Sequence, residues 1–343
     1  LLHAYGEYPG KYRLLIWRFL LGVPHNVQAH RALVGRGAHP AYVDLAQRYP
    51  IQSRTLFSRL SKVLHALAHW CPAFGAAPYV AGLAFPFVKL MGADDVATFE
   101  VVASVLLNWC RGWFEMFPHP PLHVLGGVEA LLTHHDPALQ KAIAMVGGRT
   151  AVQLHLWALM QTLLTEVLSR DEWLKVWDHV LTNEPGGGFL HFVVVAYLVH
   201  FRATLLRATS EAELRAFFRR PNAVDVNALI KTAYRLRQDT SSDMQPTPAP
   251  LERLPPGPSY PLFDGYPKVD LDWHIHERER LRADEEMLLR RRHQVLEMAA
   301  RTDSLAKQEA AWRDEKERLA ALEAARRAQA RAEETRLVEE QAA

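Results

Sequence analysis

The sequence has few cysteines and no long apolar run, and both absences exclude classes of protein. Its 343 residues contain only two cysteines, Cys71 and Cys110, and these form no Cys-x-x-Cys pair. A small disulfide-stapled scaffold and a cysteine-rich zinc site are therefore excluded. A membrane-spanning helix needs about 18 consecutive apolar residues. The longest candidate, residues 189–201, is shorter and carries His191 and His200, so we expect no membrane span.

The chain also lacks an excess of charge of either sign. Its 40 basic and 38 acidic residues leave a formal net charge of +2, which argues against a broad, sequence-independent nucleic-acid surface. Hydrophobic residues make up 49% and charged residues 23% of the chain, the balance of a folded protein rather than a disordered one. The first residue is Leu1 rather than Met, and we expect the chain to be an internal segment of a longer protein.

Proline is concentrated in one stretch, which divides the chain into three parts. Residues 245–267 hold eight prolines in 23 positions, and each proline removes a backbone donor and fixes φ. We interpret residues 241–268 as an extended linker that makes few contacts. The linker separates a domain, residues 1–240, from a tail, residues 269–343.

The tail contains neither glycine nor proline, and 15 basic and 18 acidic residues occur among its 75 positions. Ala, Glu, Arg and Leu dominate it, and all are good helix formers, so we predict one long helix. Large apolar residues recur every seven positions, first on one heptad position and then on the other: Leu281, Leu288, Val295, and then Met298, Leu305, Trp312 and Leu319. These two heptad positions form the seam of a coiled coil, and here only one of them is filled at a time. A single charged helix, a coiled coil and a helix docked on a partner therefore all remain open.

The domain before the linker is predicted to be all-helical. Apolar residues recur with i, i+3, i+4 spacing, and no alternating runs bounded by Asn-Gly or Asp-Gly turns occur. The expected helices are residues 14–21, 53–70, 94–117, 122–133, 152–168, 172–181, 189–201, 211–219 and 226–237. The predicted fold class is therefore all-α.

Motifs of common catalytic and metal sites are missing. His65 and His69 lie four residues apart on an expected helix with Cys71 just beyond, a spacing that could bring ligands to one face. No acidic residue lies between the histidines and no third ligand is evident, so we interpret them as core or surface histidines. Phosphate-loop, Gly-x-Gly-x-x-Gly and Gly-x-Ser-x-Gly motifs are absent. We expect no metal and no cofactor.

Two segments carry a resemblance to a known fold. Residues 12–24 read Arg-x-x-x-Trp followed by a leucine pair, Gly and Pro, and residues 157–178 place a Trp about twenty residues before a Trp-Asp pair. In order and spacing they resemble the TBC domain, the all-helical fold of Rab GTPase-activating proteins. The resemblance implies a structural role, by packing or by pairing, for the signature residues Arg13, Trp17, Trp157, Trp177 and Asp178.

Shorter segments narrow the resemblance to one group of TBC proteins. They are Ala66–Trp70, Ala84–Lys89, Phe99–Ala103 and Asn108–Cys110. These resemble the WD-repeat TBC family of centrosomes and centriolar satellites, whose members have a propeller, a TBC domain and a coiled-coil tail. The resemblance implies that this chain is the TBC domain and the start of the tail. It also implies a place in the cytoplasm and cytoskeleton, at the centrosome, the centriolar satellites or the ciliary axoneme.

The family's chemistry depends on two side chains, and the chain departs from both. An arginine in an Ile-x-x-Asp-x-x-Arg motif neutralises charge on the phosphoryl oxygens, and a glutamine in Tyr-x-Gln-Gly orients the attacking water. Here the second motif starts at Tyr79 and has Ala81 in place of the glutamine. Arg48 stands at the plausible arginine position, but Leu45 occupies the place of the Asp. We expect a degenerate Rab GAP that is not an enzyme.

Three functions remain open from the sequence. We favour an adaptor or scaffold with protein partners on the tail, through Leu305, Trp312 and Leu319. Trp312 is the best anchor, since an aromatic side chain brings a large apolar area into an interface. The alternatives are a module that binds a Rab-class GTPase near Tyr79 and Arg48 without hydrolysis, and a GTPase-activating protein with non-standard fingers. No nucleic-acid partner is expected.

Overall fold

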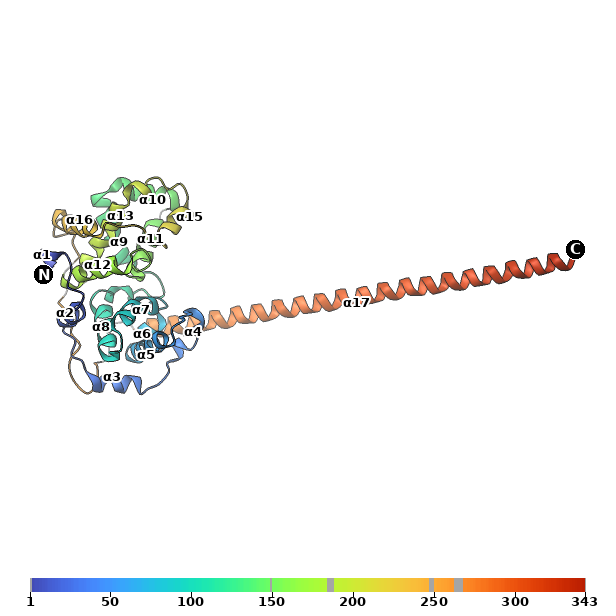
Figure 1. Ribbon diagram of the computed structural model, residues 1–343, viewed down its shortest axis with the longest axis horizontal. Coiled ribbons are helices and arrows are strands. Elements are labelled where there is room, and N and C mark those ends of the chain that lie inside the picture. Colours follow the sequence, from blue (N-terminus) through green and yellow to red (C-terminus); the bar gives the residue numbers. More distant parts are fainter. Residues whose placement is uncertain (1, 149, 184–187, 247–249, 262–267, 343) are drawn as a thin grey trace. The chain divides into compact units, whose positions relative to one another are not determined.

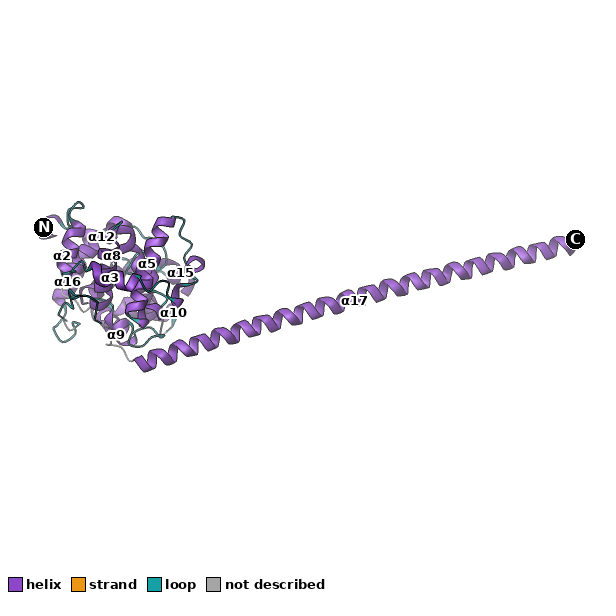
Figure 2. Cartoon of the chain, turned by 90° about the horizontal axis from the view of Figure 1, so that it is seen from below, coloured by secondary structure: helices purple, strands orange, loops and turns teal. Residues whose placement is uncertain are grey.

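The computed structural model describes residues 2–148, 150–183, 188–246, 250–261 and 268–342. Every regular element in these ranges is a helix, as the purple ribbons of Figure 2 show. The predicted all-α fold is therefore confirmed. None of the described helices is long and apolar enough to cross a membrane. The chain divides into two compact units, Leu1–His274 and Ile275–Ala343.

The first lobe of the Leu1–His274 unit is built around one central helix, α5. Its elements are α1 (Leu2–Tyr5), α2 (Arg13–Leu21), α3 (Val27–Val34), η1 (Pro40–Tyr42), α4 (Leu45–Arg48), α5 (Arg54–Trp70), α6 (Pro72–Ala76), α7 (Val80–Met91), α8 (Asp95–Asn108) and η2 (Arg111–Trp113). The Ser53 hydroxyl caps α5 by accepting from the Leu56 N–H. The helix then packs against α3, α6, α7 and α8, which makes it the core of this lobe.

The second lobe contains the later helices and is built around α13. Its elements are α9 (Leu122–His135), α10 (Pro137–Gly147), α11 (Ala151–Gln161), α12 (Arg170–Thr182), α13 (Gly188–His200), α14 (Arg202–Leu205), α15 (Glu211–Phe217) and α16 (Val226–Asp239). Residues 189–198 of α13 are all buried, and the helix packs against α16 and α9. Helix α12 also contacts α2 of the first lobe, and Figure 1 shows it between the two groups of helices.

Two of the expected helices end earlier than the sequence pattern suggested. The stretch 94–117 forms α8, a turn and η2, and the stretch 152–168 forms α11 followed by turns. After α11, Leu163 and Leu164 take left-handed backbone conformations, with φ of 51° and 66°, which a right-handed helix cannot contain. Because leucine is a good helix former, composition gave no sign of this break.

Part of the proline-rich segment packs on the first lobe, so the expectation that it makes few contacts is wrong for residues 250–261. Leu254 and Tyr260 are buried, at 3% and 6% exposure. The Glu252 backbone N–H donates to the Asn108 carboxamide oxygen at 2.7 Å, and the Asn108 amide donates back to the Glu252 carbonyl at 3.0 Å. Residues 247–249 and 262–267 of the expected linker lie outside the described residues.

The packing of this segment has a simple chemical reason. Proline removes backbone donors but leaves every carbonyl free to accept. Side chains of the first lobe donate to these carbonyls, from Asn26 Nδ2 to Gly257 at 2.7 Å and from Trp70 Nε1 to Pro261 at 2.6 Å. The Tyr260 hydroxyl in turn donates to the buried Glu100 carboxylate at 2.9 Å.

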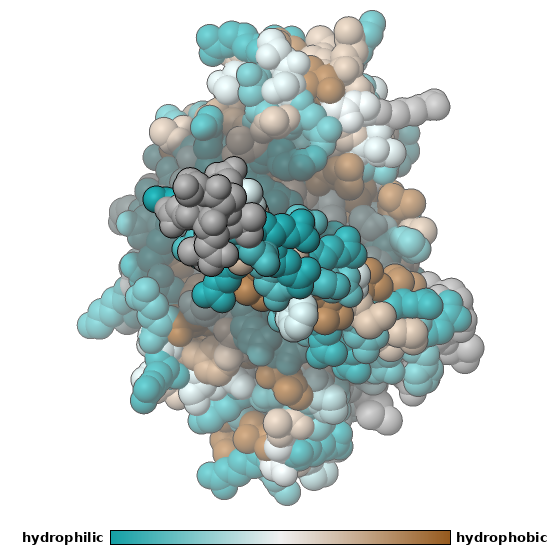
Figure 3. Space-filling view, turned by 90° about the vertical axis from the view of Figure 1, so that its right-hand side faces the viewer, coloured by the Kyte–Doolittle hydropathy of each residue, from teal (hydrophilic) through white to brown (hydrophobic). Residues whose placement is uncertain are grey.

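The tail forms a single helix, α17 (Lys268–Ala342), 75 residues long, so the predicted long helix is confirmed. At about 1.5 Å per residue it spans roughly 110 Å. Its described large apolar side chains are all exposed, and Trp312 most of all at 77%. Pairing of α17 with a second helix stays a prediction. The face drawn in Figure 3 is mostly hydrophilic, with hydrophobic side chains in separate patches.

Candidate functional site

A buried carboxylate connects the two lobes. Asp178 of α12 is fully buried and accepts from the Trp17 indole at 2.7 Å, the Tyr8 backbone N–H at 2.9 Å and Arg13 Nε at 3.0 Å. Arg13 and Trp17 reach the same carboxylate because residues four apart share one face of α2. We call Tyr8, Arg13, Trp17 and Asp178 the Asp178 node. It ties α2 of the first lobe to α12 of the second.

The Asp178 node surrounds its charge with donors. Burial raises the pKa of Asp178 above its ordinary value, and the bonds from Tyr8, Trp17 and Arg13 oppose that rise. The Arg13 guanidinium is itself buried and donates a second bond to Glu7, at 2.9 Å. A buried ion pair of this kind leaves a costly unpaired charge when either partner is removed. The arrangement supports the fold and presents no free group to a ligand.

Of the other two signature tryptophans, Trp177 lies in the core and Trp157 does not. The Trp177 ring is fully buried against Phe87 and Trp173, with centroids 5.4 and 5.5 Å away. Its indole N–H has no hydrogen-bond partner in the described part of the chain. Trp157 is only half-buried, at a separate cluster beside Tyr79.

The position expected for the arginine finger is at the end of a single helical turn, α4. Arg48 is exposed, and its Nη2 donates to the Ala41 carbonyl at 2.7 Å. Three residues earlier, Leu45 is buried at 1% exposure. The place of the family's Asp is therefore filled by a core leucine, which cannot orient Arg48 by a hydrogen bond. The guanidinium is instead held by a neighbouring backbone carbonyl.

The position expected for the glutamine finger is in the first turn of α7. Ala81 is buried at 1% exposure, so its methyl group faces protein atoms rather than solvent. It has no side-chain donor or acceptor, and α7 has no side-chain cap at its start. The side chain at this position therefore cannot hydrogen-bond a water molecule.

A hydrogen bond brings the two finger positions into one region. The Tyr49 hydroxyl, next to Arg48, donates to the Pro78 carbonyl at 3.0 Å, next to Tyr79. The end of α4 thus lies against the start of α7.

Tyr79 is the centre of an aromatic cluster beside the finger positions. Its ring contacts those of Trp157, Phe114 and Trp113, with centroids 5.1, 5.6 and 6.5 Å away. Its hydroxyl donates to the Trp113 carbonyl at 3.3 Å, and burial raises the pKa of this phenol well above its ordinary value. The region therefore offers half-buried ring faces and the Arg48 guanidinium, a combination suited to binding rather than proton transfer.

Comparison with known proteins identifies the fold family. The Rab-GTPase-TBC domain family profile matches residues 11–206, more than half of the chain. The chain belongs to this family. Both signature segments and both finger positions lie inside the matched range, so the TBC resemblance seen in the sequence is confirmed.

The relatives are longer proteins of the same family. TBC1 domain family member 31 of Bos taurus is 42% identical over 321 residues, which cover 93% of this chain and 30% of the relative. The Homo sapiens protein of that name is 40% identical over 329 residues, covering 95% and 30%. The chain thus spans about a third of the length of the curated relatives that it matches.

Solved structures share the fold. The Ypt/Rab-GAP domain of Gyp1p superimposes with a TM-score of 0.54 at 16% identity, covering 68% of this chain and 90% of that one. The Chlamydomonas flagellar RabGAP TBC domain gives 0.53 at 18% identity, covering 66% and 80%. At such low identity these likenesses establish the TBC fold alone.

The histidines that invited a metal interpretation lie on the first lobe of the TBC domain. His65 Nδ1 accepts from the His39 backbone N–H at 2.8 Å, and the rings of His39 and His69 lie 4.9 Å apart. His69 Nε2 is 3.1 Å from the Gly37 carbonyl, so the rings are engaged with the backbone and with each other. No group of three or more His, Cys, Asp or Glu in the described ranges has a geometry that could hold a metal ion.

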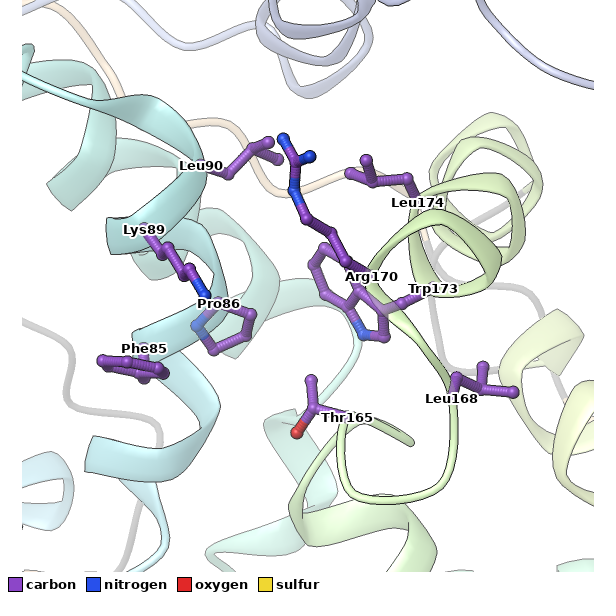
Figure 4. A pocket seen from close by; sticks show the side chains of 9 residues that line it. All are labelled: Phe85, Pro86, Lys89, Leu90, Thr165, Leu168, Arg170, Trp173 and Leu174. Atoms are coloured by element: carbon purple, nitrogen blue, oxygen red, sulfur yellow. The ribbon is translucent and has the colours of Figure 1, made fainter. Parts of the chain in front are cut away.

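Sequence reasoning missed a pocket between the lobes of the TBC domain. It has a volume of about 280 Å³ and lies between α7 and the start of α12. Its apolar walls are Phe85, Pro86, Leu90, Leu168, Trp173 and Leu174, and Lys89 and Arg170 also line it, as Figure 4 shows. The walls come from segments some eighty residues apart, so no local motif could reveal it. The one local signal was Pro86 inside a helix.

Proposed function

We propose that this TBC domain is a non-catalytic adaptor or scaffold built on a degenerate Rab-GAP fold. The observation that carries the proposal is Ala81, a buried methyl group at the position of the family's catalytic glutamine. An attacking water needs a hydrogen-bonding group to orient it. The side chain at position 81 supplies none.

The surroundings of Arg48 support the same proposal. Its guanidinium donates to the Ala41 carbonyl, and the residue three positions earlier is the buried Leu45 rather than a carboxylate. An arginine finger in other GTPase systems contributes about 10³–10⁵-fold in rate when it is held against the phosphates. In this chain no carboxylate three residues earlier orients the Arg48 guanidinium, and a backbone carbonyl binds it instead.

Single-turnover GTP hydrolysis by a panel of Rab GTPases, with the full chain in excess, tests this proposal. An intact finger pair accelerates GTP hydrolysis by several orders of magnitude. Without such a pair, we expect this chain to stimulate hydrolysis by less than about tenfold for every Rab. Larger stimulation of any Rab that is abolished by Arg48→Ala would overturn the proposal and establish an active GAP with non-standard fingers.

For the adaptor role, α17 is the proposed attachment surface for protein partners. Leu305, Trp312 and Leu319 recur every seven residues and are 54–77% exposed. An exposed tryptophan on a charged helix is typical of an interface anchor. The sequence resemblance to the WD-repeat TBC family supports a location in the cytoplasm and cytoskeleton, at the centrosome, centriolar satellites or ciliary axoneme.

The double substitution Leu305→Ala with Trp312→Ala tests the attachment surface. We expect loss of localisation, while Leu281→Ala with Leu288→Ala, on the other half of the seam, serves as the matched control. Sedimentation distinguishes the two modes of attachment. A fall from dimer to monomer indicates a coiled coil, and an unchanged mass with lost localisation indicates a docked partner. Normal localisation and an unchanged mass would exclude this seam as the anchor.

A second function is favoured by the aromatic cluster beside Arg48. The half-buried ring faces of Tyr79 and Trp157 are suited to gripping a small GTPase of the Rab class without hydrolysing its GTP. The test is binding of Rab proteins loaded with a non-hydrolysable GTP analogue. Binding that Trp157→Ala weakens at least tenfold supports this function, and no binding by any Rab excludes it.

A further inference from the structure

The pocket between α7 and α12 is a built cavity whose polar wall groups are already used. The Trp173 indole N–H donates to the Leu163 carbonyl at 2.9 Å, and the Thr165 hydroxyl donates to the Thr162 carbonyl at 2.7 Å. Both donors therefore serve the pocket's own wall. Apart from Lys89 and Arg170, the surface that remains toward the cavity is mostly apolar, with the faces of Trp173 and Pro86 in view in Figure 4.

The wall on the α12 side is held in an unusual backbone conformation. Leu163 and Leu164 lie consecutively in the left-handed region and are both buried. Such a turn is costly for leucine and persists only where the surrounding packing enforces it. The turn carries Thr165 and Leu168 to the pocket, so the cavity has a wall fixed by the core rather than a loose surface loop.

Two cations line the pocket, and neither has a close carboxylate partner in the part of the chain that the structure describes. Lys89 is exposed, and in the described part of the chain no carboxylate lies within ion-pair distance of it. Among the described residues, the ion-pair partner of Arg170 is Asp171 at 4.0 Å, with both side chains more than 70% exposed, a contact of little energetic weight. Figure 4 shows the two residues coming from opposite walls, Lys89 from α7 and Arg170 from α12. A ligand with negative charge beside its apolar part would meet both.

The size of the pocket limits the kind of ligand. Sites for drug-sized ligands and cofactors measure about 300–1,000 Å³, and this pocket measures about 280 Å³. One bulky side chain fits within such a space, while its neighbours remain at the rim.

We propose that the pocket binds a protein segment in which one bulky apolar side chain is flanked by Asp or Glu. The apolar side chain enters between Pro86 and Trp173, and the flanking carboxylates pair with Lys89 and Arg170. Neither finger position nor α17 lines the pocket, so this site is independent of the proposed function. It gives the adaptor a second contact, on the TBC domain itself.

Selection from a peptide library tests the proposal and needs no named partner. The probe is a displayed library of 11-residue peptides with Leu, Ile, Phe or Trp fixed at the centre and all flanking positions random, selected on the full chain. We expect enrichment of Asp and Glu within four residues of the centre. Selection on Lys89→Glu with Arg170→Glu should enrich Lys and Arg instead. Lys231→Glu with Arg235→Glu, an equal change on exposed residues of α16, should leave the selection acidic.

Affinity of the best peptide then locates the site. By fluorescence anisotropy, the Lys89→Glu with Arg170→Glu variant should bind it at least tenfold more weakly, and the control pair should stay within twofold. Replacement of the peptide's central residue by Asn should weaken binding by a similar factor. Neutral or basic flanks, no enriched peptides, or equal weakening in both variants would overturn the proposal. So would displacement of the peptide by decanoate together with indifference to its flanking charges, which would make the site one for an acyl carboxylate.

Discussion

The Asp178 node and the finger positions belong to one TBC domain, yet they differ in how their polar groups are used. At the node, the Asp178 carboxylate accepts from Tyr8, Arg13 and Trp17, and it holds α2 against α12. At the finger positions, Ala81 has no polar group and Arg48 bonds a neighbouring carbonyl. The parts of the family pattern that support the fold are present, whereas Ala81 and Leu45 stand where the resemblance expects the glutamine and the Asp. A TBC sequence signature is therefore evidence of architecture before it is evidence of catalysis.

The sharpest test of that difference is Asp178→Ala. The substitution removes the fully buried carboxylate from Arg13, which keeps its bond to the more exposed Glu7, and it removes the acceptor of Trp17 and Tyr8. We expect a loss of about 3–5 kcal/mol in the free energy of unfolding, measured by urea denaturation of the full chain. Asp171→Asn, on an exposed side chain of the same helix, is the control and should change it by less than about 0.5 kcal/mol. Equal effects would show that the node carries no special weight.

Acidification separates the Asp178 node from a buried histidine whose Nδ1 has no hydrogen-bond partner among the described residues. Burial lowers the pKa of His191 on α13 to about 4, from an ordinary 6.5, and its Nδ1 has no hydrogen-bond partner in the described structure. The unfolded chain takes up this proton below pH 6.5, while the folded chain does so only near pH 4. Stability is therefore full above pH 6.5 and falls by about 3 kcal/mol as the pH drops from 6.5 to 4.

The variant His191→Leu checks the origin of this pH dependence. Urea denaturation at pH 7 and at pH 4.5 should show a clearly smaller difference in the variant than in the parent chain. His276→Leu, at a histidine 79% exposed on α17, should leave the difference unchanged. A pH dependence that persists in full in His191→Leu would assign it to the other buried histidines, such as His30, His155 and His179.

A second buried carboxylate extends the comparison to the proline-rich segment. Glu100 accepts from the backbone N–H groups of His25 and Asn26 and from the Tyr260 hydroxyl. Removing that hydroxyl in Tyr260→Phe should cost about 1–2 kcal/mol of unfolding free energy. Tyr12→Phe, at an exposed tyrosine, is the matched control with no expected change. If Tyr260→Phe is also neutral, residues 250–261 rest on the first lobe without stabilising it.

The sequence predicted those features of the fold and the site that depend on local residue patterns. Helical periodicity located most helices, and the absence of Gly and Pro predicted α17. Motif order pointed to Arg13, Trp17 and Asp178 as structural residues. Their meeting at one carboxylate joins positions more than 160 residues apart, and only the fold could reveal that contact.

What the sequence missed depends on packing between distant segments. The eight prolines predicted an extended chain, but composition cannot show that Asn26 and Trp70 donate to its carbonyls. The break after α11 falls on two leucines, which composition favours as helix. The pocket forms because Pro86 and Trp173 lie close together in the fold. The sequence around either residue contains no sign of this proximity.

The most direct test of the central claim is the effect of Arg48→Ala on single-turnover GTP hydrolysis by Rab GTPases mixed with the full chain. If the finger positions carry no chemistry, the variant and the parent chain will give equal rates for every Rab, both within about tenfold of the GTPase alone. A Rab whose hydrolysis the parent chain accelerates a hundredfold or more, and which Arg48→Ala returns to its intrinsic rate, would contradict the account.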